Sequence, residues 1–273
     1  MRHACALLAV ALGMMLASPA DANEPVLLHA AGSLRGALTE VAEAFAAESG
    51  AKVEAKYGPS GTLRDEIAGG IPAQVFASAN MEHPQSLAAA GRGSPVVLFA
   101  RNRLCALVKP GLSVTPETLL ETMLREDIKL GTSTPKADPS GDYAFAVFVK
   151  AEAVKGGSRK ALEQKAQQLT GGPSSAPGPA GRSVYGWHVA EGRADIFLAY
   201  CTGALVAQRE NPGQQIVALP DALSVGADYG MTVMNDTPPA AYRFALFVVS
   251  AKGQQILAKH GFSAPALPQG EQR

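Results

Sequence analysis

Three short segments of the chain place a serine where a helix is expected to begin. They are Ala31-Gly32-Ser33, Gly58-Pro59-Ser60-Gly61 and Asp138-Pro139-Ser140-Gly141, and each follows a strand-like run. The first backbone N–H groups of a helix lack intrahelical partners, and the helix dipole is positive at that end. A serine hydroxyl adds one more hydrogen-bond donor at the same place. Such a segment is suited to binding an anion without a charged side chain.

Serine is also a common N-cap residue, so one such segment indicates little more than the start of a helix. Three in one chain indicate more, because parallel strands bring the helices that follow them to one edge of a sheet. Ligands of open α/β sheets bind at that edge. Ser33, Ser60 and Ser140 are therefore candidates for a single anion site.

The elements that must position these serines alternate short apolar runs with amphipathic stretches, which is typical of an α/β fold with a parallel sheet. Strands are expected at residues 26–30, 52–57, 74–77, 96–99, 104–108, 129–131, 194–200, 216–219 and 229–233. Helices are expected at residues 34–45, 62–68, 143–154, 160–169, 184–190, 240–249 and 253–260. The first helix should stop at Gly50, and residues 171–181 form a loop rich in Pro, Gly and Ser.

This order predicts an α/β protein of two lobes with a ligand cleft between them. The chain leaves the first lobe near Arg101 and returns to it near Val225. Lobe 1 therefore comprises residues 23–102 and 225–273, and lobe 2 comprises residues 103–224. Two connecting strands make a hinge, and the cleft between hinged lobes is a natural ligand site.

The N-terminus predicts export to the periplasm. A short basic start, an apolar run and the small residues around Ala22 together match a signal peptide over residues 1–22, cleaved near Ala22. The alternative is a membrane anchor. The apolar run is shorter than the roughly 20 residues that a membrane span needs, which favours the signal peptide.

Composition excludes several classes of protein. Lys plus Arg and Asp plus Glu both number 24, so the zero net charge favours neither nucleic acid nor an anionic membrane as a partner. Ser33 does not lie in a nucleophile elbow and has no recognisable His-Asp pair, so an enzyme is not expected. The scattered His residues and the Cys spacing do not predict a zinc site, and no cofactor is expected. Cys105 and Cys201 either pair in the oxidising compartment or stay as two buried thiols.

The sequence resembles the periplasmic molybdate-binding proteins of ABC transporters over nearly the whole mature chain. The resemblance rests on Ala31-Gly32-Ser33-Leu34, on Tyr57-Gly58-Pro59-Ser60-Gly61, on the run from Pro72 to Ala79 and on the late strand that ends at Tyr200. It implies two α/β lobes that close on the ligand.

The same resemblance implies roles for five residues. Ser33 and Ser60 match serines of the first lobe that bind the oxyanion, and the Tyr200 hydroxyl matches another donor. Ser140 and Arg182 match positions that donate a backbone N–H. The family often has a small apolar residue at the second of these positions, so the Arg182 side chain is either an added charged donor or a solvated surface group.

A site of donors alone suits molybdate, tungstate and sulfate, which carry no proton at neutral pH and only accept hydrogen bonds. Hydrogen phosphate needs an acceptor, and Asp138 and Asp142 beside Ser140 are the residues that weaken this argument. The sequence thus predicts a monomeric exported binding protein that captures molybdate or tungstate for an ABC transporter permease in the inner membrane. The alternatives are a binding protein for sulfate or another oxyanion, and an exported ligand sensor.

Overall fold

The computed structural model describes residues 24–265, in which nine strands form one continuous sheet. The expected signal peptide lies outside the described residues. The strands are β1 (Val26–Ala31), β2 (Val53–Gly58), β3 (Val75–Ala77), β4 (Val97–Val108), β5 (Leu130–Ser133), β6 (Gln167–Thr170), β7 (Ile196–Tyr200), β8 (Gln215–Ala218) and β9 (Gly226–Val233). The α-helices are α1 (Arg35–Ser49), α2 (Ser60–Ala68), α3 (Glu82–Ala89), α4 (Leu119–Leu124), α5 (Pro139–Val154), α6 (Ser158–Lys165), α7 (Val184–Ala190), α8 (Cys201–Glu210), α9 (Pro239–Val249) and α10 (Ala251–Lys259). Two short 3₁₀ turns, η1 (Gly32–Leu34) and η2 (Asp221–Leu223), complete the elements.

The sheet order is β2-β1-β3-β9-β4-β7-β5-β6, with β8 also paired to β4. β1 pairs in parallel with β2 and β3, and β5 pairs in parallel with β6 and β7. The remaining pairs, which join these two groups through β4 and β9, are antiparallel. The carboxyl ends of β1 and β2 are therefore held side by side, and the segments after them begin at the same edge of the sheet.

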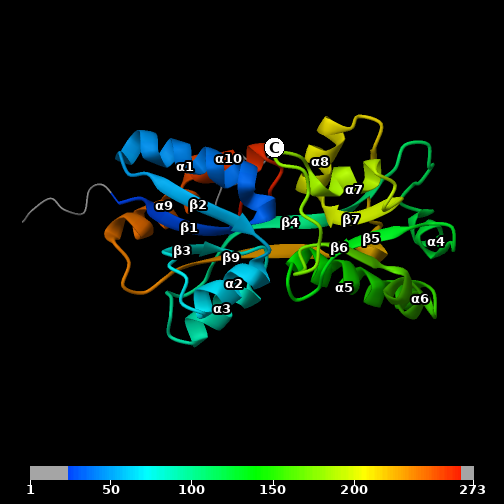
Figure 1. Cartoon of the computed structure of the whole chain (residues 1–273), viewed down its shortest axis with the longest axis horizontal. Helices are drawn as coiled ribbons and strands as arrows, with labels where there is room; N and C mark the ends of the chain where they lie inside the picture. Colours follow the sequence, from blue (N-terminus) through cyan, green and yellow to red (C-terminus); the bar gives the residue numbers. More distant parts are fainter. Residues whose placement is uncertain (1–23, 266–273) are drawn as a thin grey trace, which may run out of the picture.

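β4 runs through both halves of the molecule (Figure 1). Residues 97–103 of this strand pair with β9, whereas residues 104–108 pair with β7 and β8. The prediction of two separate strands, at residues 96–99 and 104–108, was therefore wrong. Arg101 and Arg103 are exposed on either side of the buried Asn102, so the three polar residues follow the two-residue alternation of a strand.

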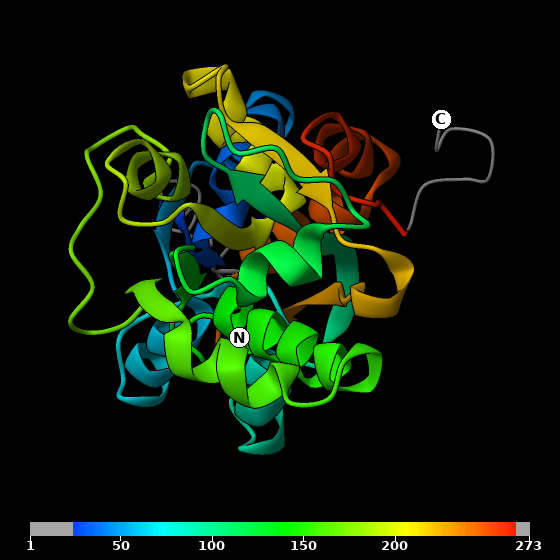
Figure 2. The ribbon, with the colours of Figure 1, turned by 90° about the vertical axis from the view of Figure 1, so that its right-hand side faces the viewer.

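Helices cover both faces of each half, which is the layered arrangement of an α/β fold. In the first half, α1, α9 and α10 pack together on one face, and α2 and α3 lie together on the other (Figure 1). In the second half, α7 and α8 pack on one face, and α5 and α6 lie on the other (Figure 2). The fold is thus the expected two-lobed α/β architecture.

Several helix ends follow directly from the sequence. Gly50 closes α1 in the left-handed conformation at φ 74°, which glycine adopts without steric cost. The Asp138 side chain caps α5, and Pro139 occupies its first turn. The predicted helix at 160–169 was wrong in its second part, where β6 follows α6 as a polar strand at the end of the sheet.

Apolar side chains of both halves form the main core. The largest fully buried side chains include Phe99, Phe148, Tyr200, Tyr229 and Phe244. Tyr200 and Tyr229 come from different halves, and their ring centroids lie 5.6 Å apart. Between residues 24 and 265, none of the helices has the length and apolar character needed to cross a membrane.

Candidate functional site

Ser60 occupies the first turn of α2, directly after β2. Pro59 has extended backbone and serves as the N-cap, so the chain turns from strand to helix within two residues. The Ser60 side chain is 1% exposed, and its Oγ accepts a hydrogen bond of 3.1 Å from the Ala79 backbone N–H. Because the oxygen is accepting, the Ser60 hydroxyl proton is left to be donated to another group.

Ser33 lies in the 3₁₀ turn η1 between β1 and α1, rather than in the α-helix itself. Its Oγ lies 3.0 Å from the Tyr229 hydroxyl. The Asn102 side-chain amide donates to the same Tyr229 oxygen at 3.3 Å and to Thr202 Oγ1 at 2.8 Å. If Tyr229 accepts from Asn102 and donates to Ser33, the Ser33 proton is left for a ligand.

Tyr200 is the last residue of β7 and the N-cap of α8. Its hydroxyl donates to the Ala79 carbonyl at 3.4 Å. Ala79 therefore contacts both Ser60, through its N–H, and Tyr200, through its carbonyl. This pair of contacts brings together two of the predicted site residues from the two halves of the molecule.

Burial keeps the site tyrosines protonated. Burial is the main cause that raises the pKa of Tyr200 and of Tyr229 far above the ordinary value for a phenol. Burial also raises the pKa of Tyr143 to about 12, with the nearby Asp228 and Asp142 adding to the shift. These hydroxyls are neutral donors across the whole physiological pH range.

The helix starts of α2 and α5 meet across the cleft. The Gly61 backbone N–H donates to the Ala137 carbonyl at 2.9 Å, which joins the first turn of α2 to the loop that precedes α5. A Cβ at Gly61 would lie 2.2 Å from the Lys136 carbonyl oxygen, so only glycine permits this approach. Ser60 and Ser140, next to these contacts, are thereby held close to the same space.

Ser140 lies in the first turn of α5 and is completely buried. Its backbone N–H donates to Asp138 Oδ1 at 3.0 Å. Its hydroxyl makes no hydrogen bond of normal geometry within residues 24–265, although the buried Tyr185 hydroxyl lies close enough to interact with it. A buried hydroxyl without a partner is costly, so this group is a ready donor to a ligand that enters the cleft.

Arg182 lies apart from the other predicted site residues. Its side chain is half exposed and pairs with Glu210, with Nε and Oε2 3.1 Å apart, and its backbone N–H donates to the Pro179 carbonyl at 3.2 Å. Glu210 ends α8, whereas Tyr200 precedes the first residue of that helix. The ten-residue helix α8 therefore separates Glu210, the partner of Arg182, from Tyr200 by about 15 Å.

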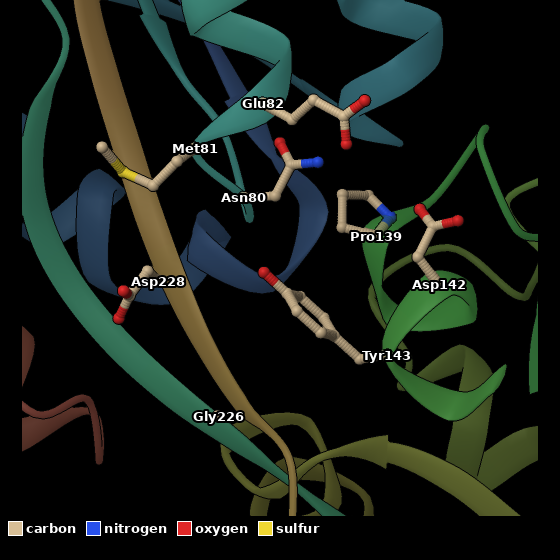
Figure 3. A pocket seen from close by; sticks show the side chains of 8 residues that line it. All are labelled: Asn80, Met81, Glu82, Pro139, Asp142, Tyr143, Gly226 and Asp228. Carbon is tan, nitrogen blue, oxygen red and sulfur yellow. The ribbon is translucent and has the colours of Figure 1, made fainter. Parts of the chain in front are cut away.

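A cavity of about 310 Å³ opens beside the helix starts, between the two halves of the molecule. Figure 3 shows Asn80, Met81 and Glu82 on one side of it and Pro139, Asp142 and Tyr143 on the other. Glu82, Asp142 and Asp228 give this opening an acidic lining, although Asp228 forms an ion pair with Arg101 at 2.8 Å. In the described part of the chain, His, Cys, Asp and Glu residues do not gather into a group that could hold a metal ion.

A disulfide joins Cys105 of β4 to Cys201, the first residue of α8. Because Cys201 follows Tyr200, the bond fixes the start of α8 to the strand beside it. The two cysteines that it joins lie 96 positions apart in the sequence.

Sequence reasoning missed Ala79, Asn102 and Tyr229. Asn102 lay between two predicted strands and was given no role, although its burial between two exposed arginines follows the alternation of a strand. Tyr229 stood in a predicted strand, but its contact with Ser33 spans 196 residues of sequence and leaves no local pattern.

Two α/β lobes that bring hydroxyl and N–H donors together at a cleft define a solute-binding protein of the periplasmic type. Comparison with known proteins agrees: a family model described as bacterial extracellular solute-binding protein matches residues 26–263, and the chain belongs to that family. Proteins of this family bind substrates for transport and are not enzymes.

The chain is similar to several individual members. An uncharacterised protein of Pasteurella multocida, PM1146, is 34% identical over 234 residues, which cover 85% of this chain and 96% of that protein. The molybdate-binding protein ModA of Mycobacterium bovis is 28% identical over 263 residues, covering 91% of this chain and 88% of ModA.

Two solved structures share the fold. The periplasmic molybdate-binding protein of Azotobacter vinelandii superposes with a TM-score of 0.71 at 20% identity, over 88% of this chain and 99% of that one. The sulfate-binding protein SubI of Mycobacterium tuberculosis superposes with a TM-score of 0.74 at 18% identity, over 91% and 89%.

Proposed function

We propose that this protein captures molybdate or tungstate in the periplasm and delivers it to an ABC uptake transporter. The observation that carries the proposal is the convergence of donors at the cleft. The Ser60 and Tyr200 hydroxyls are linked through Ala79, and Ser33 is linked through Tyr229 to Asn102. On binding, the Tyr200 O–H would leave its long contact of 3.4 Å with the Ala79 carbonyl and donate to the anion instead. The similarity to ModA over most of the chain supports the choice of ligand.

The hydroxyl donors favour an anion that carries no proton, whereas the Asp138 carboxylate beside Ser140 is an acceptor that would favour hydrogen phosphate. Ser33 and Ser60 each have a hydroxyl proton to donate once their oxygens accept from Tyr229 and Ala79. Ser140 supplies a buried hydroxyl that makes no hydrogen bond of normal geometry in the described chain. Each hydrogen bond from such a group to a charged acceptor contributes about 1.5–3 kcal/mol. We do not assign a ligand contact to Arg182, because its side chain and backbone N–H are both bonded elsewhere.

The proposed lobes are residues 23–102 with 225–273, and residues 103–224. The pairing of β4 supports this division, since its partner changes from β9 to β7 and β8 after Arg103. Ala79 and Gly61 of the proposed lobe 1 already contact Tyr200 and Ala137 of the proposed lobe 2, so we infer that this structure is the closed form. We further propose that the protein is exported with cleavage near Ala22 and acts as a monomer.

Sulfate is the second candidate ligand. The similarity of the fold to SubI favours it, and sulfate shares the tetrahedral shape and the lack of a proton. A role as an exported sensor would use the same site and differ only in the partner that recognises the closed form.

Isothermal titration calorimetry with molybdate, tungstate, sulfate and phosphate separates these possibilities. We expect molybdate or tungstate to bind with a dissociation constant at least about a hundred-fold below that of phosphate, a difference of about 2.7 kcal/mol. Equal or tighter binding of phosphate would show that the site supplies an acceptor. Tightest binding of sulfate would establish the second candidate in place of the first.

A further inference from the structure

The Asp138 carboxylate occupies the place on α5 that an anion would use. Asp138 is the N-cap of this 16-residue helix, and its Oδ1 accepts the Ser140 backbone N–H at 3.0 Å. Under the proposed function, that N–H faces the oxyanion. The N–H donor at this helix start is therefore already bound to a negatively charged group.

The surroundings leave the carboxyl group little freedom to move aside. The backbone of Gly171 packs against the Asp138 side chain, because a Cβ there would lie 2.5 Å from Asp138 Cβ and 2.9 Å from Asp138 Oδ2. Glycine at this position lets the backbone approach the N-cap side chain closely. The Ser140 hydroxyl, in the same helix turn, is buried and makes no hydrogen bond of normal geometry in residues 24–265, with the Tyr185 hydroxyl close to it. An anion that uses this hydroxyl must come close to Asp138.

The groups around Asp138 do not neutralise it. Burial raises its pKa to about 6, the Ser140 N–H and the Ser133 hydroxyl act in the opposite direction, and Asp142 one turn along α5 raises it further. Tyr185 of α7 and Tyr200 of β7 interact with Asp138 electrostatically, and both are phenols that stay neutral. Lys136, in the loop before the helix, is exposed and binds Asp142 through its backbone N–H at 2.8 Å.

Glu82 lies across the cavity on α3 and adds to the negative charge that Asp142 experiences. Asp142 itself is a half-buried carboxyl group, and burial raises its pKa as well. It is therefore the second carboxylate that could respond to an anion in the cleft, and it supplies the matched control for Asp138.

We propose that Asp138 competes with the oxyanion for the start of α5, so that binding of a dianion takes up one proton on this carboxylate. The proton comes from solvent and converts the carboxylate into a neutral carboxylic acid. The acid removes the repulsion and offers an O–H donor in place of a negative charge. This inference rests on the proposed function, because it concerns the same site.

The direction of the pH effect follows from linkage. A bound dianion raises the pKa of Asp138 above its value in the free protein, so the complex binds more protons than the free protein does at neutral pH. Affinity then rises as pH falls from about 8 to about 6 and levels off below the free-protein pKa. Uptake of one proton gives at most a ten-fold change in the dissociation constant per pH unit, and we expect about ten- to hundred-fold over this range.

The test compares the intact protein with Asp138→Asn and Asp142→Asn, by calorimetry with sulfate and with molybdate between about pH 6 and about pH 8. Sulfate is included because it does not change its own protonation in this range. Asparagine keeps the N-cap acceptor but carries no charge. We expect Asp138→Asn to bind both anions at least about ten-fold more tightly than the intact protein at pH 8, with little pH dependence. Asp142→Asn should retain most of the pH dependence.

Proton uptake gives a second readout that does not need a variant. Titrations in two buffers of different ionisation enthalpy should show close to one proton taken up per anion near pH 7. A dissociation constant of the intact protein that does not change with pH would overturn the inference while leaving the proposed function in place. Weaker binding by Asp138→Asn at both ends of the range would also overturn it, because the carboxylate would then be a favourable partner of the ligand. Failure of all the anions to bind at any pH would instead refute the proposed function.

Discussion

Replacing Tyr229 by Phe tests whether the buried hydrogen bonds behind Ser33 orient its hydroxyl. The substitution removes the hydroxyl that lies 3.0 Å from Ser33 Oγ and 3.3 Å from the Asn102 amide nitrogen. The ring stays, with its edge contacts to Phe99 and Phe262. Asn102 keeps its hydrogen bond of 2.8 Å to Thr202, so the fold should lose only about 1 kcal/mol of unfolding free energy.

The effect on affinity should be smaller than that of removing the donor itself. Without Tyr229, the Ser33 hydroxyl can turn away from the ligand, at a cost of about 0.5–1.5 kcal/mol for the lost neutral hydrogen bond. This corresponds to roughly a two- to ten-fold weaker dissociation constant for molybdate. Ser33→Ala removes a bond to a charged acceptor and should cost about ten- to hundred-fold.

Calorimetry on the two single variants and on the double variant completes a thermodynamic cycle. If Tyr229 acts through Ser33, its replacement should have no further effect once Ser33 is alanine. Tyr57→Phe is the matched control, because the Tyr57 hydroxyl binds Thr39 at 3.1 Å on the exposed side of lobe 1. Fully additive losses in the double variant would refute the positioning role, as would unchanged affinity in Tyr229→Phe alone.

Three further outcomes are expected. Ser60→Ala and Tyr200→Phe should each weaken molybdate binding about ten- to hundred-fold in calorimetry with folding intact, and unchanged affinity in both would mean that the site is misplaced. Arg182→Ala should change affinity less than about two-fold, since it removes only an exposed ion pair worth under about 1 kcal/mol; a large loss would restore its role as a charged donor. Reduction of the Cys105–Cys201 disulfide should lower the unfolding free energy by about 2–4 kcal/mol in denaturant titrations, and two titratable thiols in exported, unreduced protein would contradict the bond.

The features of the site that sequence reasoning predicted are local ones. Ser60 and Ser140 each follow a strand within a few residues and start a helix, so residue type and periodicity were sufficient to place them. The stop of α1 at Gly50 was likewise predicted from adjacent residues. The capping of α5 by Asp138 was not predicted, because Ser140 was taken as the residue that begins this helix.

The features that sequence reasoning missed depend on contacts between residues that lie far apart in the sequence. The bond between Asn102 and Tyr229 spans 127 residues, and neither residue belongs to a short motif. β6 was missed because its residues Gln167–Thr170 lack the apolar alternation of a half-buried strand, and pairing with β5 overrides the local pattern. Arg182 was assigned by resemblance alone, and its pairing with Glu210 joins residues that lie 28 positions apart in the sequence.

Crystals soaked in tungstate test the central claim most directly, because the anomalous scattering of tungsten locates the anion without bias from the protein. The account predicts one strong peak enclosed by Ser33, Ser60, Ser140 and Tyr200, with the oxyanion oxygens within hydrogen-bonding distance of their hydroxyl or N–H groups. A peak in the acidic cavity lined by Glu82 and Asp228, or beside Arg182, would contradict it.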